Sequence, residues 1–260
     1  MTRLSQTGNR GELRVYRDPE QLARAAAELF VSLSETAFES RGRFRVALSG
    51  GSTPHRVYEL LATNEFSRRV DWKGIEFFWG DERYVAADDC ESNYRMVAEA
   101  LLRHIPVPAA NIHRVRTEIS PARAAAEAYE IELRQSFEYA PAIPQFDLIF
   151  LGIGTNGHTA SLFPHSPVLD EKSRLIAADF VGAANMWRIT MTLPLLNRGR
   201  TVAFLAEGNQ KAEVLREVLL GPSDSQRLPA QLVAPEGKLL WMMDEAAVTL
   251  LPQMNTRRSA

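Results

Sequence analysis

The sequence has little cysteine and no long hydrophobic run. Cys90 is the only cysteine among 260 residues, which excludes a disulfide within the chain and favours a reducing compartment. Apolar runs such as residues 148–151 are much shorter than the ~20 residues that a membrane-spanning helix needs. Residues 1–12 are polar and lack the apolar run of a secretory signal. We therefore expect a cytoplasmic protein with no membrane partner.

The sequence also lacks an excess of charge of either sign. Its 30 Lys and Arg residues stand against 32 Asp and Glu residues, so no global field attracts nucleic acid and we expect no such partner. A bound anion would have to be held by a local group of positive charges. No repeat, low-complexity segment or linker divides residues 1–260, and we predict one domain. We expect a monomer.

Short apolar runs, which predict strands, alternate with longer amphipathic segments, which predict helices. The predicted strands are residues 13–16, 44–48, 75–79, 146–151, 175–178, 188–192, 202–205 and 239–242. The predicted helices follow the capping residues at 18–21, the glycines at 50–51, Ser92 and Ser120, and cover 210–219. The helix after Ser92 is expected to run to about His104. This alternation predicts an α/β fold with an open, mostly parallel twisted sheet and helices on both faces, which is a Rossmann-like arrangement.

Four polar loops follow predicted strands directly, at residues 50–54, 80–83, 152–158 and 207–211. In an open parallel sheet, ligands bind beyond the carboxyl ends of the strands. We therefore expect the four loops to meet at one edge of the sheet and to form the functional site there.

The first of these loops suits a phosphate group. Gly50 and Gly51 allow the backbone to approach an anion closely, and Ser52 and Thr53 add hydroxyl donors. Pro54 at the start of a helix leaves the free amides of the first turn available to the ligand. An ordinary glycine turn with a capping threonine is an equally open interpretation of the loop alone.

The third loop contains the pattern G-x-G-x-x-G at residues 152–157, which is also found in dinucleotide-binding proteins. Asp179 could then be the acid that binds a ribose. However, Pro164 and Pro167 leave no room for the full crossover helix that holds a pyrophosphate. The pattern therefore does not favour a nicotinamide-dependent enzyme.

Other hydrolase patterns are missing, which leaves a general base and water. Residues 50–54 end in proline and do not form the G-x-S-x-G nucleophile elbow, and no H-E-x-x-H metal motif occurs. Of the five histidines, His158 is the one that ends a glycine-rich loop on the expected ligand edge. Imidazole is the natural base near neutral pH, although a structural role for His158 is equally open from spacing alone.

Five segments carry a resemblance when they are taken together and in order. They are ALSGGSTP (47–54), WGDER (79–83) with ESNYR (91–95), LGIGTNGHTASLFP (151–164), RITMT (188–192) and GNQKA (208–212). They closely resemble the 6-phosphogluconolactonase family, a branch of the glucosamine/galactosamine-6-phosphate isomerase superfamily. The resemblance covers about residues 13–248, the expected core. It implies the sugar-phosphate isomerase/lactonase type of α/β fold.

The family resemblance implies hydrolysis of 6-phosphoglucono-δ-lactone to 6-phosphogluconate in the oxidative pentose phosphate pathway, without a metal or an organic cofactor. It implies that His158 is the base that activates water, with Asp81 and Arg83 at the reacting end of the sugar. The implied phosphate-binding residues are Ser52, Thr53, Arg188 and Lys211, beside Gly50 and Gly51.

The sequence leaves the oxyanion donors and the partner of Asp81 open. Attack by water creates an oxyanion that needs preorganised donors, and either Arg83 or the amides around Asn156 and Gly157 could supply them. Asp81 could orient His158 or a sugar hydroxyl.

Two alternative functions would use some of the same loops. The related glucosamine-6-phosphate isomerase/deaminase resembles this chain in the same loops, but its characteristic carboxylates are replaced by Asn156 and Phe163, and Arg83 stands where it has tyrosine. Losing both carboxylates disfavours ring opening and proton transfer. A non-catalytic sugar-phosphate sensor would have no need of His158 in a glycine loop.

Overall fold

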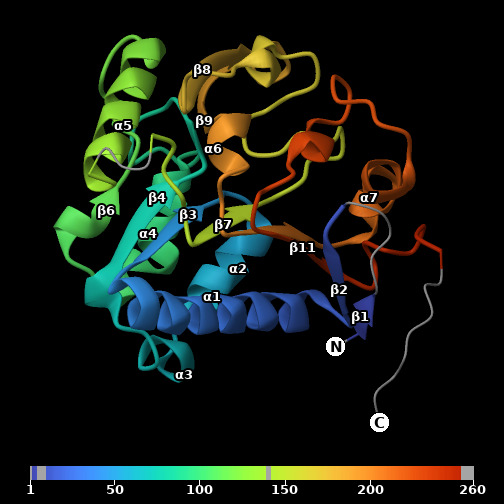
Figure 1. Cartoon of the computed structure of the whole chain (residues 1–260), viewed down its shortest axis with the longest axis horizontal. Helices are drawn as coiled ribbons and strands as arrows, with labels where there is room; N and C mark the ends of the chain where they lie inside the picture. The colour runs from blue at the N-terminus through green and yellow to red at the C-terminus, as the bar shows by residue number, and fades with distance from the viewer. Residues whose placement is uncertain (1, 5–9, 139–141, 253–260) are drawn as a thin grey trace.

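An eight-stranded sheet lies at the centre of the computed structural model, which describes residues 2–4, 10–138 and 142–252 (Figure 1). The strand order is β1-β2-β11-β10-β7-β3-β4-β6, and all neighbours are parallel except β1 and β2. The strands are β1 (Thr2–Leu4), β2 (Glu12–Tyr16), β3 (Phe44–Leu48), β4 (Ile75–Trp79), β6 (Ile112–His113), β7 (Leu148–Leu151), β10 (Thr201–Ala206) and β11 (Lys238–Asp244). The predicted open, mostly parallel sheet is confirmed.

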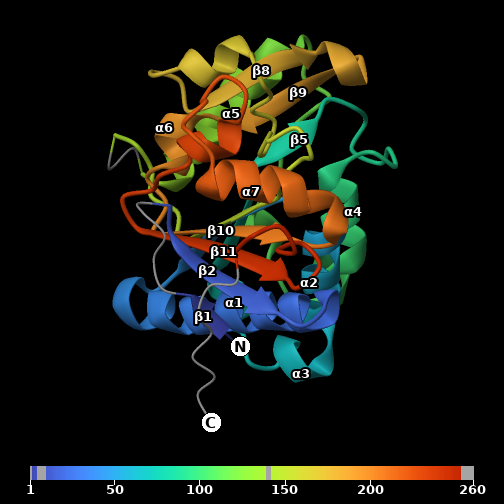
Figure 2. The ribbon, with the colours of Figure 1, turned by 90° about the vertical axis from the view of Figure 1, so that its right-hand side faces the viewer.

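Helices cover both faces of this sheet (Figure 2). They are α1 (Pro19–Arg41), α2 (Ser52–Ala62), α3 (Asn64–Ser67), α4 (Asn93–Ala100), α5 (Ala122–Ser136), α6 (Leu193–Leu196) and α7 (Ala212–Leu220). In the described ranges, no helix combines the length and apolar character that crossing a membrane requires.

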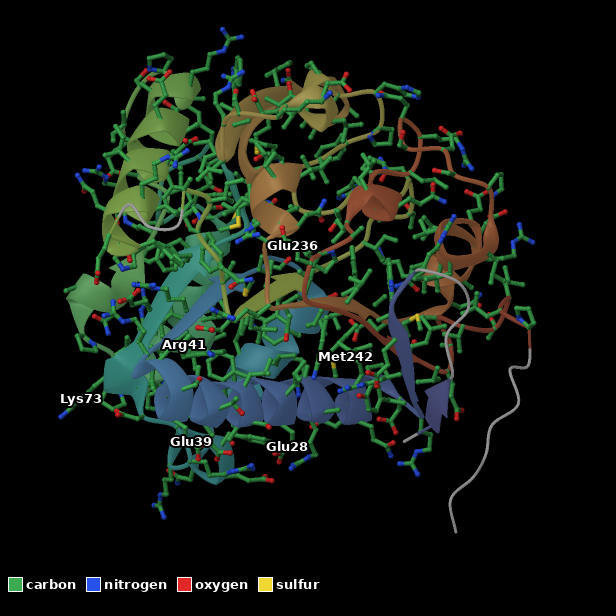
Figure 3. All side chains as sticks on the ribbon, viewed as in Figure 1. Glu28, Glu39, Arg41, Lys73, Glu236 and Met242 are labelled. Carbon is green, nitrogen blue, oxygen red and sulfur yellow. The ribbon has the colours of Figure 1, made fainter. Side chains whose placement is uncertain are left out.

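The strands are buried on both faces, as a parallel sheet between two helical layers requires. Leu148 and Phe150 of β7 pack into a core with α1, α2 and α4, whereas Ile149 and Leu151 pack into a second core with α5, α6 and α7. Figure 3 shows Glu28 and Glu39 on the outward side of α1, away from the sheet. The sheet therefore holds two hydrophobic cores apart and leaves its edges for loops.

Local capping signals explain where two helices begin. Asp18 accepts a hydrogen bond from the amide of Gln21 at 2.8 Å, so α1 starts as predicted, and Ser92 likewise caps α4. However, α4 ends at Ala100 rather than near residue 104, because Leu101 leaves the helical region and residues 102–104 form a separate 3₁₀ turn.

A second, antiparallel sheet was not predicted from the sequence. It has the order β5-β9-β8 and contains β5 (Asp81–Arg83), β8 (Ile176–Val181) and β9 (Met186–Met191). Two of these strands were expected in the main sheet, and β5 was expected to be a loop. Only four residues join β8 to β9, too few for the crossover that a parallel pair needs.

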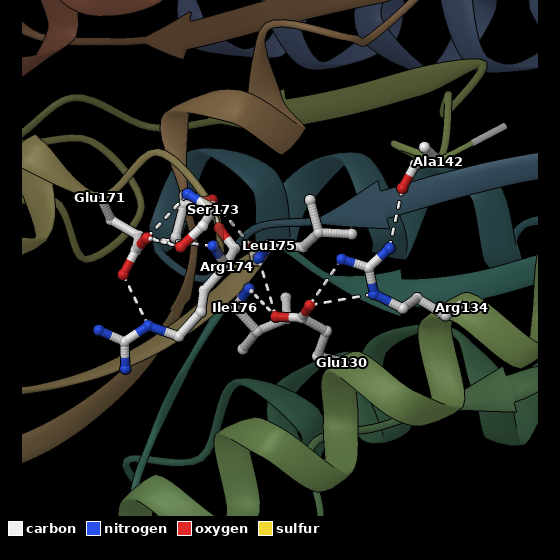
Figure 4. Close-up of polar contacts among 9 residues, drawn as sticks. Glu130, Arg134, Ala142, Glu171, Ser173, Arg174, Leu175 and Ile176 are labelled. Carbon is white, nitrogen blue, oxygen red and sulfur yellow. Dashed lines mark hydrogen bonds and ion pairs between the residues drawn. The ribbon is translucent and has the colours of Figure 1, made fainter. Parts of the chain in front are cut away.

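The small sheet is fixed to the rest of the molecule through α5. The carboxylate of Glu130 accepts hydrogen bonds from the amides of Leu175 and Ile176 and from Arg134, as Figure 4 shows. One residue earlier on α5, the Tyr129 hydroxyl bonds to the backbone of Trp79 at the end of β4. The two sheets therefore have a defined relative position, which determines the geometry of the site between them.

Candidate active site

A cavity of about 220 Å³ lies beyond the carboxyl ends of the main-sheet strands. All four predicted loops contribute to its lining, although the second of them is β5. The contributing parts are residues 49–54, Asp81 and Arg83 of β5, Asn93 of α4, residues within 152–160, Leu205, and Lys211. The expected meeting of the four segments is therefore found in the structure.

The loop at residues 50–54 approaches the cavity with its backbone. Gly51 has φ +106°, a conformation that favours glycine, and it caps the N-terminus of α2. A Cβ atom on Gly50 would lie 1.9 Å from Oδ1 of Asn93, so only glycine fits there. The free amides and positive dipole end of α2 face the same space as Ser52 and Thr53. This arrangement suits an anion.

Strand β5 places an acidic side chain, Asp81, and a cationic side chain, Arg83, at the cavity. Asp81 is buried, and its carboxylate accepts a hydrogen bond from the Ser161 hydroxyl at 2.7 Å. Arg83 donates to the carbonyl oxygen of Glu91 at 2.7 Å. Asp81 and Arg83 reach the same cavity because alternate side chains of a strand point to one side.

Arg83 and Arg188 are cross-strand neighbours on β5 and β9. In both guanidinium groups, Nε is buried and has no hydrogen-bond partner among the described residues. Burial lowers the pKa of Arg188, and the positive charge of Arg83 lowers it further. Two adjacent cations with unused donors form a local positive field that suits a dianion.

His158 lies in the cavity with a defined tautomer. Its Nδ1 is 2.6 Å from Oδ1 of Asn156, and an amide oxygen only accepts hydrogen bonds, so Nδ1 carries the proton and Nε2 keeps its lone pair. Its ring stacks on Phe163 with 4.3 Å between centroids. A Cβ on Gly154 would lie 2.1 Å from the imidazole, so glycine at 154 leaves the ring its place.

The imidazole is neutral at physiological pH. Burial, together with the charges of Lys211, Arg188 and Arg83, lowers the pKa of His158 to about 4, although the charge of Asp81 opposes this. A neutral imidazole with a free Nε2 can accept a proton from water.

Lys211 lines the cavity from the loop at residues 207–211. Its ammonium donates to the carbonyl oxygen of Ile153 at 2.7 Å, and burial lowers its pKa, which the nearby Glu207 opposes. Glu207 also accepts a hydrogen bond from the Ser52 hydroxyl at 3.2 Å. Lys211 keeps donors free for a ligand, because an ammonium has three.

Most of the predicted site residues line the cavity, but three do not. The residues that line the cavity are Gly50, Gly51, Ser52, Thr53, Asp81, Arg83, His158 and Lys211. Three others do not line it. Asn156 holds the His158 ring, Gly157 packs against Leu228, and Arg188 lies within β9 rather than at the end of a main-sheet strand.

Sequence reasoning missed Asn93, Ser161 and the buried Glu82. Asn93 was within reach, because it follows the capping Ser92 inside a segment that carried the resemblance. Ser161 and Glu82 also lie in such segments, but their roles were not predictable, because their contacts join segments that are not adjacent in the chain.

The fold and the cavity define an α/β protein that is adapted to a small anionic ligand at the carboxyl edge of an open sheet. A sequence model of the family described as glucosamine-6-phosphate isomerases/6-phosphogluconolactonase matches residues 17–241. The chain belongs to this family.

Individual proteins that are similar to this chain carry names from the same family. The 6-phosphogluconolactonase of Synechocystis sp. is 43% identical over 81% of this chain and 86% of that relative. The 6-phosphogluconolactonase of Homo sapiens is 38% identical over 93% and 94%. The solved structure of 6-phosphogluconolactonase from Trypanosoma cruzi has a TM-score of 0.81 and 30% identity over 92% of this chain and 96% of that one. A monomeric glucosamine-6-phosphate deaminase shares the fold, with a TM-score of 0.78 and 20% identity.

Proposed function

We propose that the chain hydrolyses 6-phosphoglucono-δ-lactone to 6-phosphogluconate in the oxidative pentose phosphate pathway. Relatives named 6-phosphogluconolactonase that match most of the chain at about 40% identity support this activity. The observation that carries the mechanism is a neutral imidazole, with Nε2 free, in a cavity surrounded by cationic side chains.

We propose that Nε2 of His158 removes a proton from water as the water oxygen attacks the lactone carbonyl carbon. Asn156 keeps the other ring nitrogen protonated, so that Nε2 faces the reaction. The charge of Asp81 favours the imidazolium that forms in this step. The tetrahedral intermediate then breaks the bond between the carbonyl carbon and the ring oxygen, and the proton on Nε2 passes to that oxygen, which becomes a hydroxyl.

Positive groups on both sides of the imidazole have separate tasks in this proposal. The amides of the loop at 50–53 and Lys211 hold the phosphate. Arg188, which does not line the cavity, adds positive charge beside Arg83 on the neighbouring strand. Arg83, which lines the cavity beside Asp81, stabilises the developing oxyanion. These assignments divide the cations between the two charged ends of the substrate.

The deaminase alternative is not favoured. Proton transfer between carbons and ring opening need additional acid–base groups near the histidine. The side chains that contact His158 are instead the amide of Asn156 and the apolar ring of Phe163. The likeness to the solved deaminase extends to the fold alone, at 20% identity.

We further propose that the protein works in the cytoplasm as a monomer and as one domain, without a metal ion or organic cofactor. The single, exposed Cys90 suits a reducing compartment. Light scattering of the purified protein tests the oligomeric state, and a dimer mass would contradict it.

The test of the function is lactone loss with the purified protein, measured above the spontaneous rate. His158→Ala should abolish most turnover and leave 6-phosphogluconate binding nearly intact, because the imidazole acts on water rather than on the phosphate. His104→Ala is the matched control, since that histidine lies outside the cavity and contacts the carbonyl of Glu99. Unchanged turnover in His158→Ala would refute the assignment of the base.

A further inference from the structure

A buried glutamate that the mechanism does not use lies beside the cavity. Glu82 is the middle residue of β5, between Asp81 and Arg83, and it is 2% exposed. Because side chains of a strand alternate, Glu82 points away from the space that its two neighbours line. Its buried carboxylate therefore needs hydrogen-bond donors from another part of the protein.

That environment is the first turn of α4. Oε1 of Glu82 accepts hydrogen bonds from the amides of Arg83 and Asn93, at 2.8 and 2.7 Å. Oε2 accepts from the amide of Tyr94 at 2.8 Å and from the Ser92 hydroxyl at 3.3 Å. Among the described residues, no Lys or Arg side chain forms an ion pair with this carboxylate. Glu82 thus satisfies amides at the start of a helix that lack intrahelical partners.

The cap fixes Asn93 against two other parts of the site. Asn93 is buried, and its amide nitrogen donates to the carbonyl oxygen of Asp81 at 2.9 Å. Its Oδ1 lies so close to Gly50 that a Cβ there would be 1.9 Å away. One carboxylate therefore connects β5, the start of α4 and, through Asn93, the loop at residues 50–54.

We propose that Glu82 is a positioning residue, which sets the distance between the reacting groups on β5 and the phosphate loop through Asn93. This inference rests on the proposed lactone hydrolysis, since it assigns Asp81 and Gly50 to opposite ends of one substrate. Glu82 itself touches no substrate. Its removal would shift Asp81 and Arg83 relative to the loop without altering either side chain.

The pH dependence of kcat/KM distinguishes a positioning role of Glu82 from a role in stability alone. Burial, helped by the charge of Asp81 and opposed by the three amides, raises the pKa of Glu82 to about 7. The other charged or titratable groups that interact with it are Arg188 on β9 and Tyr129 on α5, while α4 contributes amides and the Ser92 hydroxyl. Protonation removes an acceptor from the cap, so kcat/KM should fall below about pH 7, well above the pKa of His158.

The test compares Glu82→Gln with Asp147→Asn. Asp147 is a matched control, because it is also a buried carboxylate that accepts a backbone amide, that of Arg45 at 2.9 Å, but it lies at the amino end of β7, away from the cavity. Glu82→Gln should lower kcat/KM at pH 8 by about tenfold or more, since misplacement of about 1 Å can cost 10²-fold. It should also remove the fall in kcat/KM near pH 7. Asp147→Asn should lower the melting temperature and leave kcat/KM and its pH profile unchanged.

Several outcomes would overturn the proposal. One is a Glu82→Gln enzyme with the kcat/KM and pH profile of the unmodified protein, and another is an equal loss in both variants. If Glu82→Gln does not fold, Asn93→Ala carries the same test and should show a comparable loss of kcat/KM, whereas full activity would refute the connection. If the unmodified protein does not hydrolyse the lactone, the proposed function fails. Affinity for inorganic phosphate, weaker in Glu82→Gln but not in Asp147→Asn, then still decides whether Glu82 positions the loop.

Discussion

Replacing Asn156 by aspartate adds a single charge next to the proposed base. The amide oxygen of Asn156 lies 2.6 Å from Nδ1 of His158, and aspartate keeps an acceptor in that place. The variant should therefore keep the tautomer of His158 and change only the electrostatic cost of protonating it. A nearby negative charge favours the imidazolium, so the pKa of His158 should rise.

The size of this shift follows from the geometry. With the charge of the imidazolium spread over its ring, the two charges would be about 4 Å apart, which gives about 1 kcal/mol in water and about 4 kcal/mol at an effective dielectric constant of 20. At 1.36 kcal/mol per pKa unit, this corresponds to a rise of about one to three units. The pKa of His158, about 4 in the unmodified protein, should therefore reach about 5 to 7 in Asn156→Asp.

Two assays measure the shift. NMR titration of the His158 ring protons gives the pKa directly, and kcat/KM against pH shows where the base is lost. At pH 6, Asn156→Asp should be less active than the unmodified protein because more of its His158 is protonated, while at pH 8 the two should be similar. Asn64→Asp, an exposed residue on α3, is the control for a surface charge. A His158 pKa that does not move would refute the assigned contact.

Two further substitutions test the other parts of the site. Gly154→Ala should lower kcat by about 100-fold, because its Cβ would lie 2.1 Å from the His158 ring and displace it, whereas Gly182→Ala, with no atom within 4 Å, should have no effect on turnover. Equal turnover in both glycine variants would contradict the packing argument. Lys211→Ala should raise KM for the phosphorylated lactone by about 10- to 100-fold, as expected for loss of one hydrogen bond to a charged group. A lactone without the phosphate separates the effects, since an equal loss with both substrates would show that Lys211 binds another part of the molecule.

The main sheet and its loops were predictable because their signals are local. The caps at Asp18 and Ser92, the apolar strands, and the glycine-rich turns each lie within a few residues of one another, and the parallel order then brings the strand ends to one edge. His158 was within reach because it ends one of these turns.

The small sheet and the buried cap were not predictable on the same grounds. Strand β5 has only three residues, Asp81 to Arg83, and all of them are charged, so it shows no alternation of apolar and polar residues. Its identity as a strand depends on pairing with β9, more than a hundred residues later. Glu82 and Asn93 acquire their roles only when α4 and β5 meet, which is a matter of tertiary contact.

The pairing of Arg83 with Arg188 sets a limit on how stable this protein can become. Two partly buried guanidinium groups that repel each other and leave a buried Nε unsatisfied destabilise the fold whenever no anion is bound. An apolar side chain at either position would remove that cost and make the unliganded protein more stable. The same change would lower its affinity for a negatively charged substrate. Thermostable variants that are selected without a ligand should therefore tend to lose this pair first, and selection in the presence of phosphate would preserve it.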